Sequence, residues 1–146
     1  MDFDTTVKVA VYRATAESGS PPLLEVVAEK VGATAAAIKQ AYGRLRASRL
    51  LLLESDGGTI RMAPPFSAIK TSFLVQSDNK SYYGNCIWDA LAIPAALHQD
   101  AIIHASDGYT GEPITLEVRQ QKILPEPCVI HFAVPAALWW KNVIYT

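Results

Sequence analysis

Cysteine is scarce in this sequence of 146 residues, in which Cys86 and Cys128 are the only two. Two cysteines are too few for a disulfide scaffold, and a reducing compartment would leave both as free thiols. The sequence also lacks a CxxC pair, an HxxxH motif and any other paired spacing typical of zinc ligands. A fold stabilised by structural zinc is therefore not expected.

Long apolar runs and export signals are missing as well. The sequence has no run of about eighteen uncharged apolar residues, which a membrane-spanning helix requires. The N-terminus carries Asp2, Asp4 and Lys8 instead of the basic and then apolar stretch of a signal peptide. The formal net charge is −1, so bulk electrostatics indicate no polyanionic partner. We expect a soluble, cytoplasmic protein with no membrane partner.

The motifs of the common nucleotide-binding and hydrolase folds are absent too. There is no GxGxxG, no Walker loop and no GxSxG elbow, which removes the usual sequence grounds for nucleotide binding or serine-based hydrolysis. Half of the residues are hydrophobic and 18% are charged, as in an ordinary folded chain. The length suits one domain or two small subdomains.

The first part of the chain has the periodicity of helices. Val7, Val11 and Ala14 recur at helical spacing and would form one buried face. Gly32 is typical of a helix end, and Thr34 is a suitable N-cap for the next helix. Three helices are predicted, over residues 4–18, 22–31 and 34–48.

A hairpin is predicted after the third helix. Residues 50–54 and 59–62 favour strands, and the intervening Ser-Asp-Gly-Gly is a turn signal. Three helices followed by a hairpin form the winged helix-turn-helix arrangement. We therefore predict that residues 1–64 are a winged-helix-like domain, a three-helix bundle with a hairpin.

This arrangement leaves a DNA-binding role open beside a purely structural one. The third helix carries four basic residues that could contact phosphates, Lys39, Arg44, Arg46 and Arg49. Glu54 and Asp56 lie at the hairpin, however, where a DNA-binding wing would carry lysine or arginine. DNA is thus a less favoured partner than a small molecule.

Residues 65–146 read as a second, mixed domain, so the predicted class is α+β, with a small mixed α/β domain after the helical one. A helix is predicted from about Gly84 to Ala92 and is expected to stop or kink at Pro94. Strands are predicted over residues 73–76, 101–105, 114–118, 129–134 and 143–145, with a short helical turn over 136–140.

A thiol and a carboxyl lie three residues apart near the start of that helix. Residues at i and i+3 share a helix face, so Cys86 and Asp89 could act on the same small molecule. The same residues also fit a structural role. Free cysteine is among the most buried residue types, and an aspartate near a helix start is commonly a cap.

These residues lie in a longer stretch that resembles the organomercurial (alkylmercury) lyases. The resemblance covers about half of the chain, and the C-x-x-D helix motif is its most specific part. Members of that family combine a winged-helix-type part with a small α/β catalytic part, in the order predicted here. The similar segments are Phe66-Ser67, residues 82–97 (YYGNCIWDALAIPAAL), 110–114 (TGEPI), 131–135 (HFAVP) and Trp139-Trp140.

The resemblance implies protonolysis of carbon–mercury bonds, the chemistry of mercury detoxification, with no organic cofactor. It implies that Cys86 binds the thiophilic Hg(II) as a thiolate and that Asp89 delivers a proton to the mercury-bound carbon. Trp88 and Tyr83 would line the substrate pocket. An apolar surround would exclude water and favour a protonated carboxyl on Asp89.

The sequence departs from the family pattern at the second catalytic cysteine. The family carries it after a stretch like residues 139–146, and this chain ends at or just before that place, so we expect a short form that lacks the C-terminal part. Cys128 is the only other thiol and is the candidate second mercury ligand, with Cys86. A second copy of the chain, forming a homodimer, would be one way to complete the core.

Two hypotheses follow for the function. The first is an alkylmercury lyase-like enzyme that uses Cys86 and Asp89 on an organomercurial or Hg(II). The second is a winged-helix regulatory protein that senses a metal or small ligand through a degenerate lyase domain.

Overall fold

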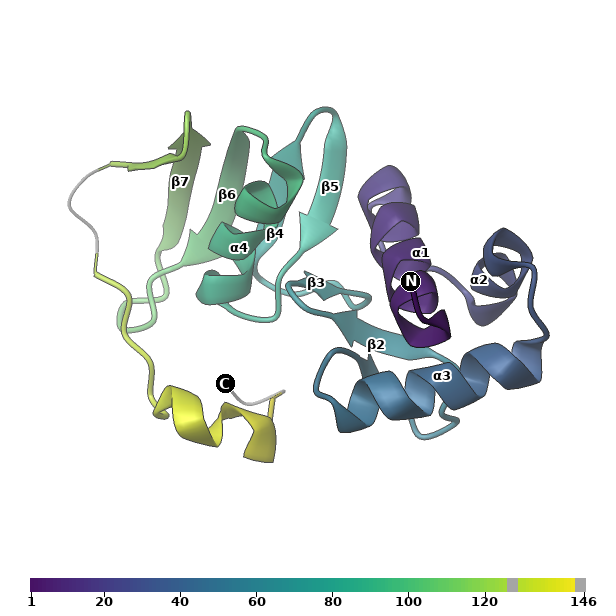
Figure 1. The fold of residues 1–146 in the computed structure, drawn as a ribbon. Helices are drawn as coiled ribbons and strands as arrows, with labels where there is room; N and C mark the ends of the chain where they lie inside the picture. The colour runs from purple at the N-terminus through teal and green to yellow at the C-terminus, as the bar shows by residue number, and fades with distance from the viewer. Residues whose placement is uncertain (126–128, 144–146) are drawn as a thin grey trace. The chain divides into compact units, whose positions relative to one another are not determined.

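The computed structural model describes residues 1–125 and 129–143, and the chain divides into two compact units, Met1–Ile69 and Lys70–Thr146 (Figure 1). Each unit has its own elements and is described by itself. Within the described residues, no helix combines the length and the apolar character needed to cross a membrane.

Three helices form most of the first unit, and the predicted N-cap Thr34 and helix end Gly32 are present, together with a cap at Asp2 that was not predicted. The Asp2 side chain accepts a hydrogen bond from the Thr5 N–H, and the Thr34 side chain accepts one from the Ala37 N–H. Gly32 ends the second helix in the left-handed conformation. The helices are α1 (Phe3–Ser18), α2 (Leu24–Val31) and α3 (Ala35–Ala47).

The core of this unit is formed by the apolar faces that the periodicity predicts. Ile38, Tyr42 and Leu45 of α3 are buried together with residues of α1 and α2. Leu51 and Ile60 extend the cluster to the strands that follow. The unit therefore holds one continuous apolar core.

A three-stranded antiparallel sheet completes the first unit. Its strands are β1 (Leu52–Leu53), β2 (Ile60–Ala63) and β3 (Phe66–Ser67), in the order β1-β2-β3. The hairpin between β1 and β2 was predicted and is present. The third strand was not predicted, because two prolines precede it and its two residues are too few to show alternation.

Charged side chains of this unit form an ion pair and hydrogen bonds within the unit. Arg44 holds Asp4 through two hydrogen bonds, Nε to Oδ2 at 2.8 Å and Nη2 to Oδ1 at 2.7 Å. The Asp56 carboxylate accepts hydrogen bonds from Thr59 and the Gly58 N–H, and these, led by the Thr59 side chain, lower its pKa to about 2. Arg44 is thus already paired with a carboxylate of its own chain.

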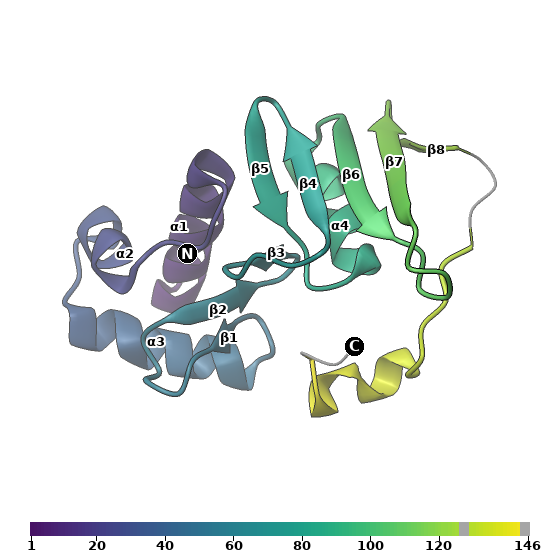
Figure 2. The same ribbon diagram turned by 180° about the vertical axis from the view of Figure 1, so that it is seen from behind.

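The second unit is built on a five-stranded antiparallel sheet with the order β5-β4-β6-β7-β8 (Figure 2). Hairpins join β4 to β5, β6 to β7 and β7 to β8. The strands are β4 (Leu74–Ser77), β5 (Lys80–Tyr83), β6 (Ala101–Ser106), β7 (Pro113–Arg119) and β8 (Lys122–Leu124).

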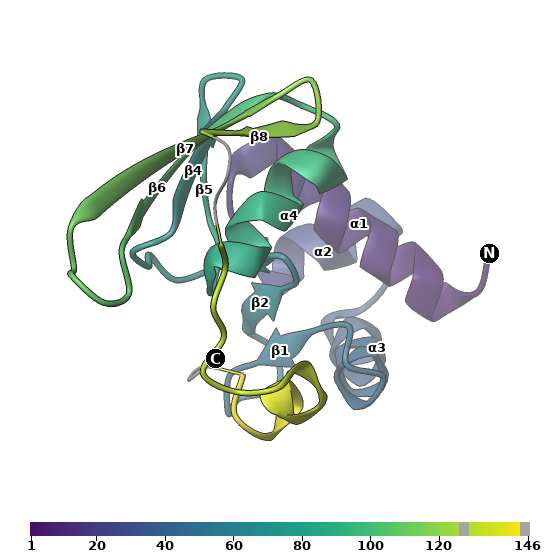
Figure 3. The same ribbon diagram turned by 90° about the vertical axis from the view of Figure 1, so that its left-hand side faces the viewer.

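One helix, α4 (Ile87–Leu97), covers one face of this sheet against β4 and β6 (Figure 3). Because strand side chains alternate, Val75 and Ile103 point to the helix and are fully buried. Ala90 and Ile93 of α4 are buried as well. This packing fixes the start of α4, where the predicted site lies.

The predicted bounds of α4 were wrong at both ends. The helix starts at Ile87, not near Gly84, and Pro94 lies inside it. Proline removes one helical hydrogen bond, but Pro94 is buried and the helix closes within the next turn, at the left-handed His98.

Two further expectations for this unit differ from the structure. The predicted strand over residues 129–134 is absent: these residues join no strand of the sheet, and Phe132 contacts Trp88 of α4 instead. The short helical turn was predicted correctly and is a 3-10 helix, Ala136–Lys141. The predicted strand 143–145 lies largely outside the described residues.

Candidate functional site

Cys86 is the residue that caps the start of α4. Its backbone is extended, with φ −145° and ψ 179°, and its carbonyl accepts the first helical hydrogen bond from the Ala90 N–H at 3.0 Å. The side chain makes no capping hydrogen bond to the backbone. The half-buried thiol therefore sits beside the N–H groups of the first turn, at the positive end of the helix dipole.

Asp89 brings its carboxyl back to the same helix end. Its Oδ2 accepts a hydrogen bond from the Asn85 N–H at 3.2 Å and lies 3.5 Å from Cys86 Sγ, which donates to it. This resembles a capping box, in which an acidic residue of the first turn satisfies a backbone donor that precedes the helix. The predicted proximity of thiol and carboxyl is present, and the carboxyl also acts as a cap.

Burial keeps both groups protonated to higher pH than usual. Desolvation raises the pKa of Cys86, and the Asp89 carboxylate adds to that increase, while N–H groups of the first turn oppose it. Desolvation also raises the pKa of Asp89, against hydrogen bonds from Cys86 and Asn85 that lower it. A proton can thus be held by this pair and exchanged across 3.5 Å.

The raised thiol pKa predicts slow alkylation that Asp89→Asn accelerates. Iodoacetamide reacts with the thiolate, so at pH 7.5 Cys86 should react more slowly than a free cysteine. Asp89→Asn removes a carboxylate that raises the pKa of Cys86, so the thiolate fraction should increase and alkylation should become severalfold faster. Mass spectrometry of the Cys86 peptide from pH 6 to pH 10 measures this. An equal or slower rate in the variant would contradict it.

Gly84 allows the chain to pass close to the first turn of α4. A Cβ on this buried residue would lie 2.7 Å from the Ala90 backbone N and 3.1 Å from Asp89 Cβ. Its own backbone is held on both sides, since its N–H donates to the Phe73 carbonyl and its carbonyl accepts from the Thr71 hydroxyl. The glycine therefore sets the position of Asp89.

Gly84→Ala should displace this turn. The added methyl group meets backbone atoms, so we expect a loss of about 1–3 kcal/mol in the free energy of unfolding, typical of overpacking. The distance between thiol and carboxyl should change with it. Gly43→Ala is the matched control, because Gly43 lies in α3 with no atom within 4 Å of an added Cβ. It should be neutral or stabilising by up to about 1 kcal/mol. Urea unfolding compares the two, and equal effects would contradict the expectation.

The segment 129–143 lies against the start of α4. The Asn85 side chain donates a hydrogen bond to the Val143 carbonyl at 2.7 Å. Phe132 meets Trp88 edge-on, with ring centroids 6.3 Å apart, and Trp139 lies 4.9 Å from Phe132 on the same measure. Asn85 thus contacts Asp89 through its backbone and this segment through its side chain, a link that sequence reasoning missed.

An apolar hollow of about 570 Å³ lies at the same end of α4. Ile87, the residue after Cys86, contributes to its wall, and the ends of β6 and β7 supply most of the rest. The sequence did not reveal it, because its walls come from five separate stretches of the sequence. The lining residues are Phe73, Ile87, Ala105, Ser106, Asp107, Gly108, Tyr109, Ile114, Leu116, Val129, Ile130 and His131.

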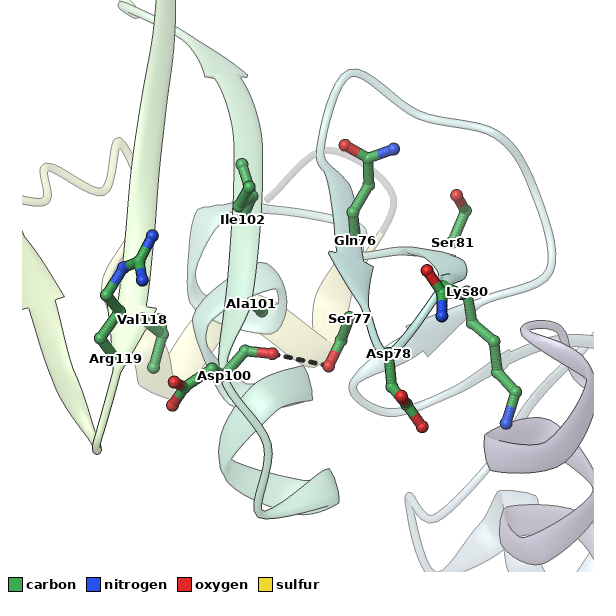
Figure 4. A pocket seen from close by; sticks show the side chains of 11 residues that line it. Gln76, Ser77, Asp78, Lys80, Ser81, Asp100, Ala101, Ile102, Val118 and Arg119 are labelled. Atoms are coloured by element: carbon green, nitrogen blue, oxygen red, sulfur yellow. Dashed lines mark hydrogen bonds between the residues drawn. The ribbon is translucent and has the colours of Figure 1, made fainter.

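A second hollow, of about 460 Å³, lies beyond the other end of α4 and is polar (Figure 4). It surrounds the turn between β4 and β5, where the Ser77 hydroxyl donates to the Asp100 carbonyl at 2.7 Å. Asp78, Lys80 and Arg119 contribute charges of both signs. Its lining residues include no cysteine or histidine, so it offers no ligand to a thiophilic metal.

The other predicted site residues are dispersed. Cys128 lies outside the described residues, so the structure gives no distance from it to Cys86. Trp88 is 54% exposed, and neither it nor Tyr83 lines the apolar hollow. Among residues 1–125 and 129–143, no three histidine, cysteine or acidic side chains gather as metal ligands.

Comparison with known proteins shows which family shares the part of the chain that contains the start of α4. The model of the family described as MerB, alkylmercury lyase, matches residues 66–146, which is more than half of the chain. The chain belongs to the alkylmercury lyase family. The match includes Cys86, Asp89 and the apolar hollow, so all of these lie in the part that the family shares.

Solved structures agree with this assignment at the level of the fold. The crystal structure of the mercury-bound form of MerB2 superposes with a TM-score of 0.62 at 20% sequence identity. The alignment covers 82% of this chain and 64% of that one, so this chain spans less than two thirds of the length of the protein it matches. No curated protein matches the sequence significantly.

Proposed function

We propose that this protein cleaves the carbon–mercury bond of organomercurials by protonolysis, as an alkylmercury lyase. The observation that carries the proposal is the Cys86 thiol 3.5 Å from the Asp89 carboxyl at the start of α4. Membership of the family supports the reaction class, and the mercury-bound MerB2 structure supports mercury as the element that is bound.

The proton of the thiol and the electrons of the carbon–mercury bond account for the whole reaction. The Cys86 sulfur binds mercury as a thiolate and its proton passes to Asp89. Asp89 then gives a proton to the mercury-bound carbon, and the electron pair of the carbon–mercury bond forms the new carbon–hydrogen bond. The products are a hydrocarbon and Hg(II) held by sulfur, with no change in the oxidation state of mercury and no need for an organic cofactor.

The environment of Asp89 suits a proton donor. Burial raises the pKa of its carboxyl, so the protonated form persists closer to neutral pH than for an exposed aspartate. The N–H groups of the first turn stabilise the anions left on sulfur and carboxylate after each proton transfer. Burial therefore favours the protonated carboxyl before the proton transfer, and the helix N-terminus stabilises the anions that remain after it.

Several finer assignments belong to the proposal. We assign Cys128 as a second mercury ligand because it is the only other thiol of the sequence, and Trp88 and Tyr83 as residues near the substrate. The first part of the chain, residues 1–64, would be a winged-helix-like domain ahead of a lyase-like domain, residues 65–146. Three helices and the β1–β2 hairpin support that reading. Cytoplasmic location and a homodimer remain predictions.

A regulatory, DNA-binding function finds little support. Arg44, a predicted phosphate contact, is engaged with Asp4, and the Asp56 carboxylate stays charged at the hairpin tip. We therefore retain the lyase as the proposed function.

The test is release of hydrocarbon from an organomercurial in the presence of excess thiol. Phenylmercury acetate should give benzene and methylmercury chloride should give methane, both measured by gas chromatography. Each turnover should leave one Hg(II) bound to thiol. Stoichiometric uptake of mercury without hydrocarbon would overturn the proposal.

A further inference from the structure

The apolar hollow of about 570 Å³ beside α4 has no role in the chemistry described above. Ala105 at the end of β6 pairs with Ile114 of β7, and both side chains line the hollow on the face of the sheet that α4 covers. Leu116, two residues further along β7, lies on the same face. These side chains form a wall held by sheet pairing.

The lining favours a hydrocarbon over an ion. Asp107 is the one acidic residue among the described lining residues, and its Oδ1 already accepts hydrogen bonds from the Tyr109 and Thr110 N–H groups. Its carbonyl accepts a further one from Gly111. The carboxylate thus stabilises the β6–β7 turn at the rim, and the aliphatic wall offers burial of apolar surface to a guest.

The size and position of the hollow suit the organic part of a mercury compound. An apolar cavity of about 150 Å³ is enough to bind benzene, and ligand pockets commonly measure about 300–1,000 Å³. Ile87 lies both in the wall of the hollow and directly after Cys86, at the first position of α4. Hollow and thiol therefore share one helix end.

We propose that this hollow receives the hydrocarbon group of the substrate and that Ala105, Ile114 and Leu116 set the preference for bulky, especially aryl, groups over methyl. The inference rests on the proposed function, in that Cys86 holds the mercury. A methyl group leaves the hollow unfilled, whereas a phenyl group gains burial there.

Ala105→Leu tests this by narrowing the hollow. For phenylmercury, kcat/KM should fall at least about tenfold, the scale on which apolar pockets discriminate, while the value for methylmercury stays within about twofold. Thr115→Leu is the matched control, because Thr115 is on the neighbouring strand, is exposed and points away from α4. In Thr115→Leu, the ratio of kcat/KM for phenylmercury to kcat/KM for methylmercury should equal that of the wild type. An unchanged ratio in Ala105→Leu, with the fold intact by circular dichroism, would overturn the inference.

Benzene alone provides a second measurement that needs no mercury. Titration of the wild type should shift the methyl NMR signals of Ala105, Ile114 and Leu116 and leave that of Thr115 in place. Ile114→Phe, a second way to fill the hollow, should abolish these shifts if Ala105→Leu fails to fold.

The two measurements separate the inference from the function on which it rests. Benzene shifts without cleavage of any organomercurial would remove the lyase proposal and leave a hydrocarbon site. Cleavage without benzene shifts, and with the same phenyl-to-methyl ratio in every variant, would leave the lyase and remove the hydrocarbon site.

Discussion

Cys86→Ser is expected to abolish cleavage of both phenylmercury and methylmercury. Hg(II) binds thiolate far better than hydroxyl, so the variant loses the group that takes up the substrate. Loss of a residue that bonds to the reacting species commonly costs a thousandfold or more, and we expect a decrease of at least about 10³ in kcat/KM. Gas chromatography of the released hydrocarbon measures it.

Cys128→Ser is the companion variant, because it removes the other thiol of the chain. If Cys128 is the second mercury ligand, this variant should retain uptake of one organomercurial per chain and lose turnover. The double variant should take up none. Full activity in Cys86→Ser would show that cleavage does not depend on the thiol at α4.

Asp89→Asn is the second substitution with a large expected effect. Asparagine is close to aspartate in shape, and its amide oxygen can still accept from the Asn85 N–H, but it cannot pass a proton to carbon. We expect kcat to fall by about 10²- to 10⁴-fold, the range of general acid catalysis, while Cys86 still takes up mercury. Mercury bound per chain, measured together with hydrocarbon release, separates binding from cleavage.

The stability of Asp89→Asn serves as its control. Because the folded-state pKa of Asp89 is raised, the folded protein binds this proton more tightly than the unfolded chain does. The stability that this bound proton adds to the folded protein is therefore fully present at acidic pH, below the pKa of the unfolded chain. It is lost as pH rises through the raised pKa of the folded state. At pH 7 the variant should be at least as stable as the wild type, whereas at pH 3 the difference should shrink. Lower stability at pH 7 would attribute any loss of activity to unfolding.

Local signals in the sequence predicted the first unit well. The cap at Thr34 depends only on one side chain and the backbone three residues later, so the local sequence was enough to predict it. The apolar faces of α1 and α3 follow a period that needs no knowledge of the partner helix. The third strand was missed because two residues carry no period.

The second unit was harder, because its elements depend on distant partners. Residues 129–134 have strand propensity but join no strand of the sheet, and Phe132 packs against Trp88 of α4 instead. Pro94 was expected to stop or kink α4, yet it lies buried inside the helix, which continues to Leu97. Local preference was overridden by packing in both places.

The candidate site was predicted in part. The spacing of Cys86 and Asp89 correctly placed sulfur and carboxyl together, although as a cap and a first-turn residue and not as two residues inside a helix. The family resemblance was confirmed. The roles of Gly84 and Asn85 and the apolar hollow could not be predicted, because a close backbone approach and walls from separate segments leave no pattern in a single sequence.

Because Cys86 is the N-cap residue of α4, the reactivity of the site and the stability of the helix favour different side chains at this position. Serine, threonine, asparagine and aspartate are the favoured N-caps and are worth about 0.5–2 kcal/mol over residues that cannot cap. The thiol makes no such bond, so the first-turn donors stay available to an anion that forms beside them. Selection for stability alone would favour a side chain with a capping oxygen at this position. The missing cap weakens the start of α4, and it leaves the N–H groups of the first turn free to bind that anion.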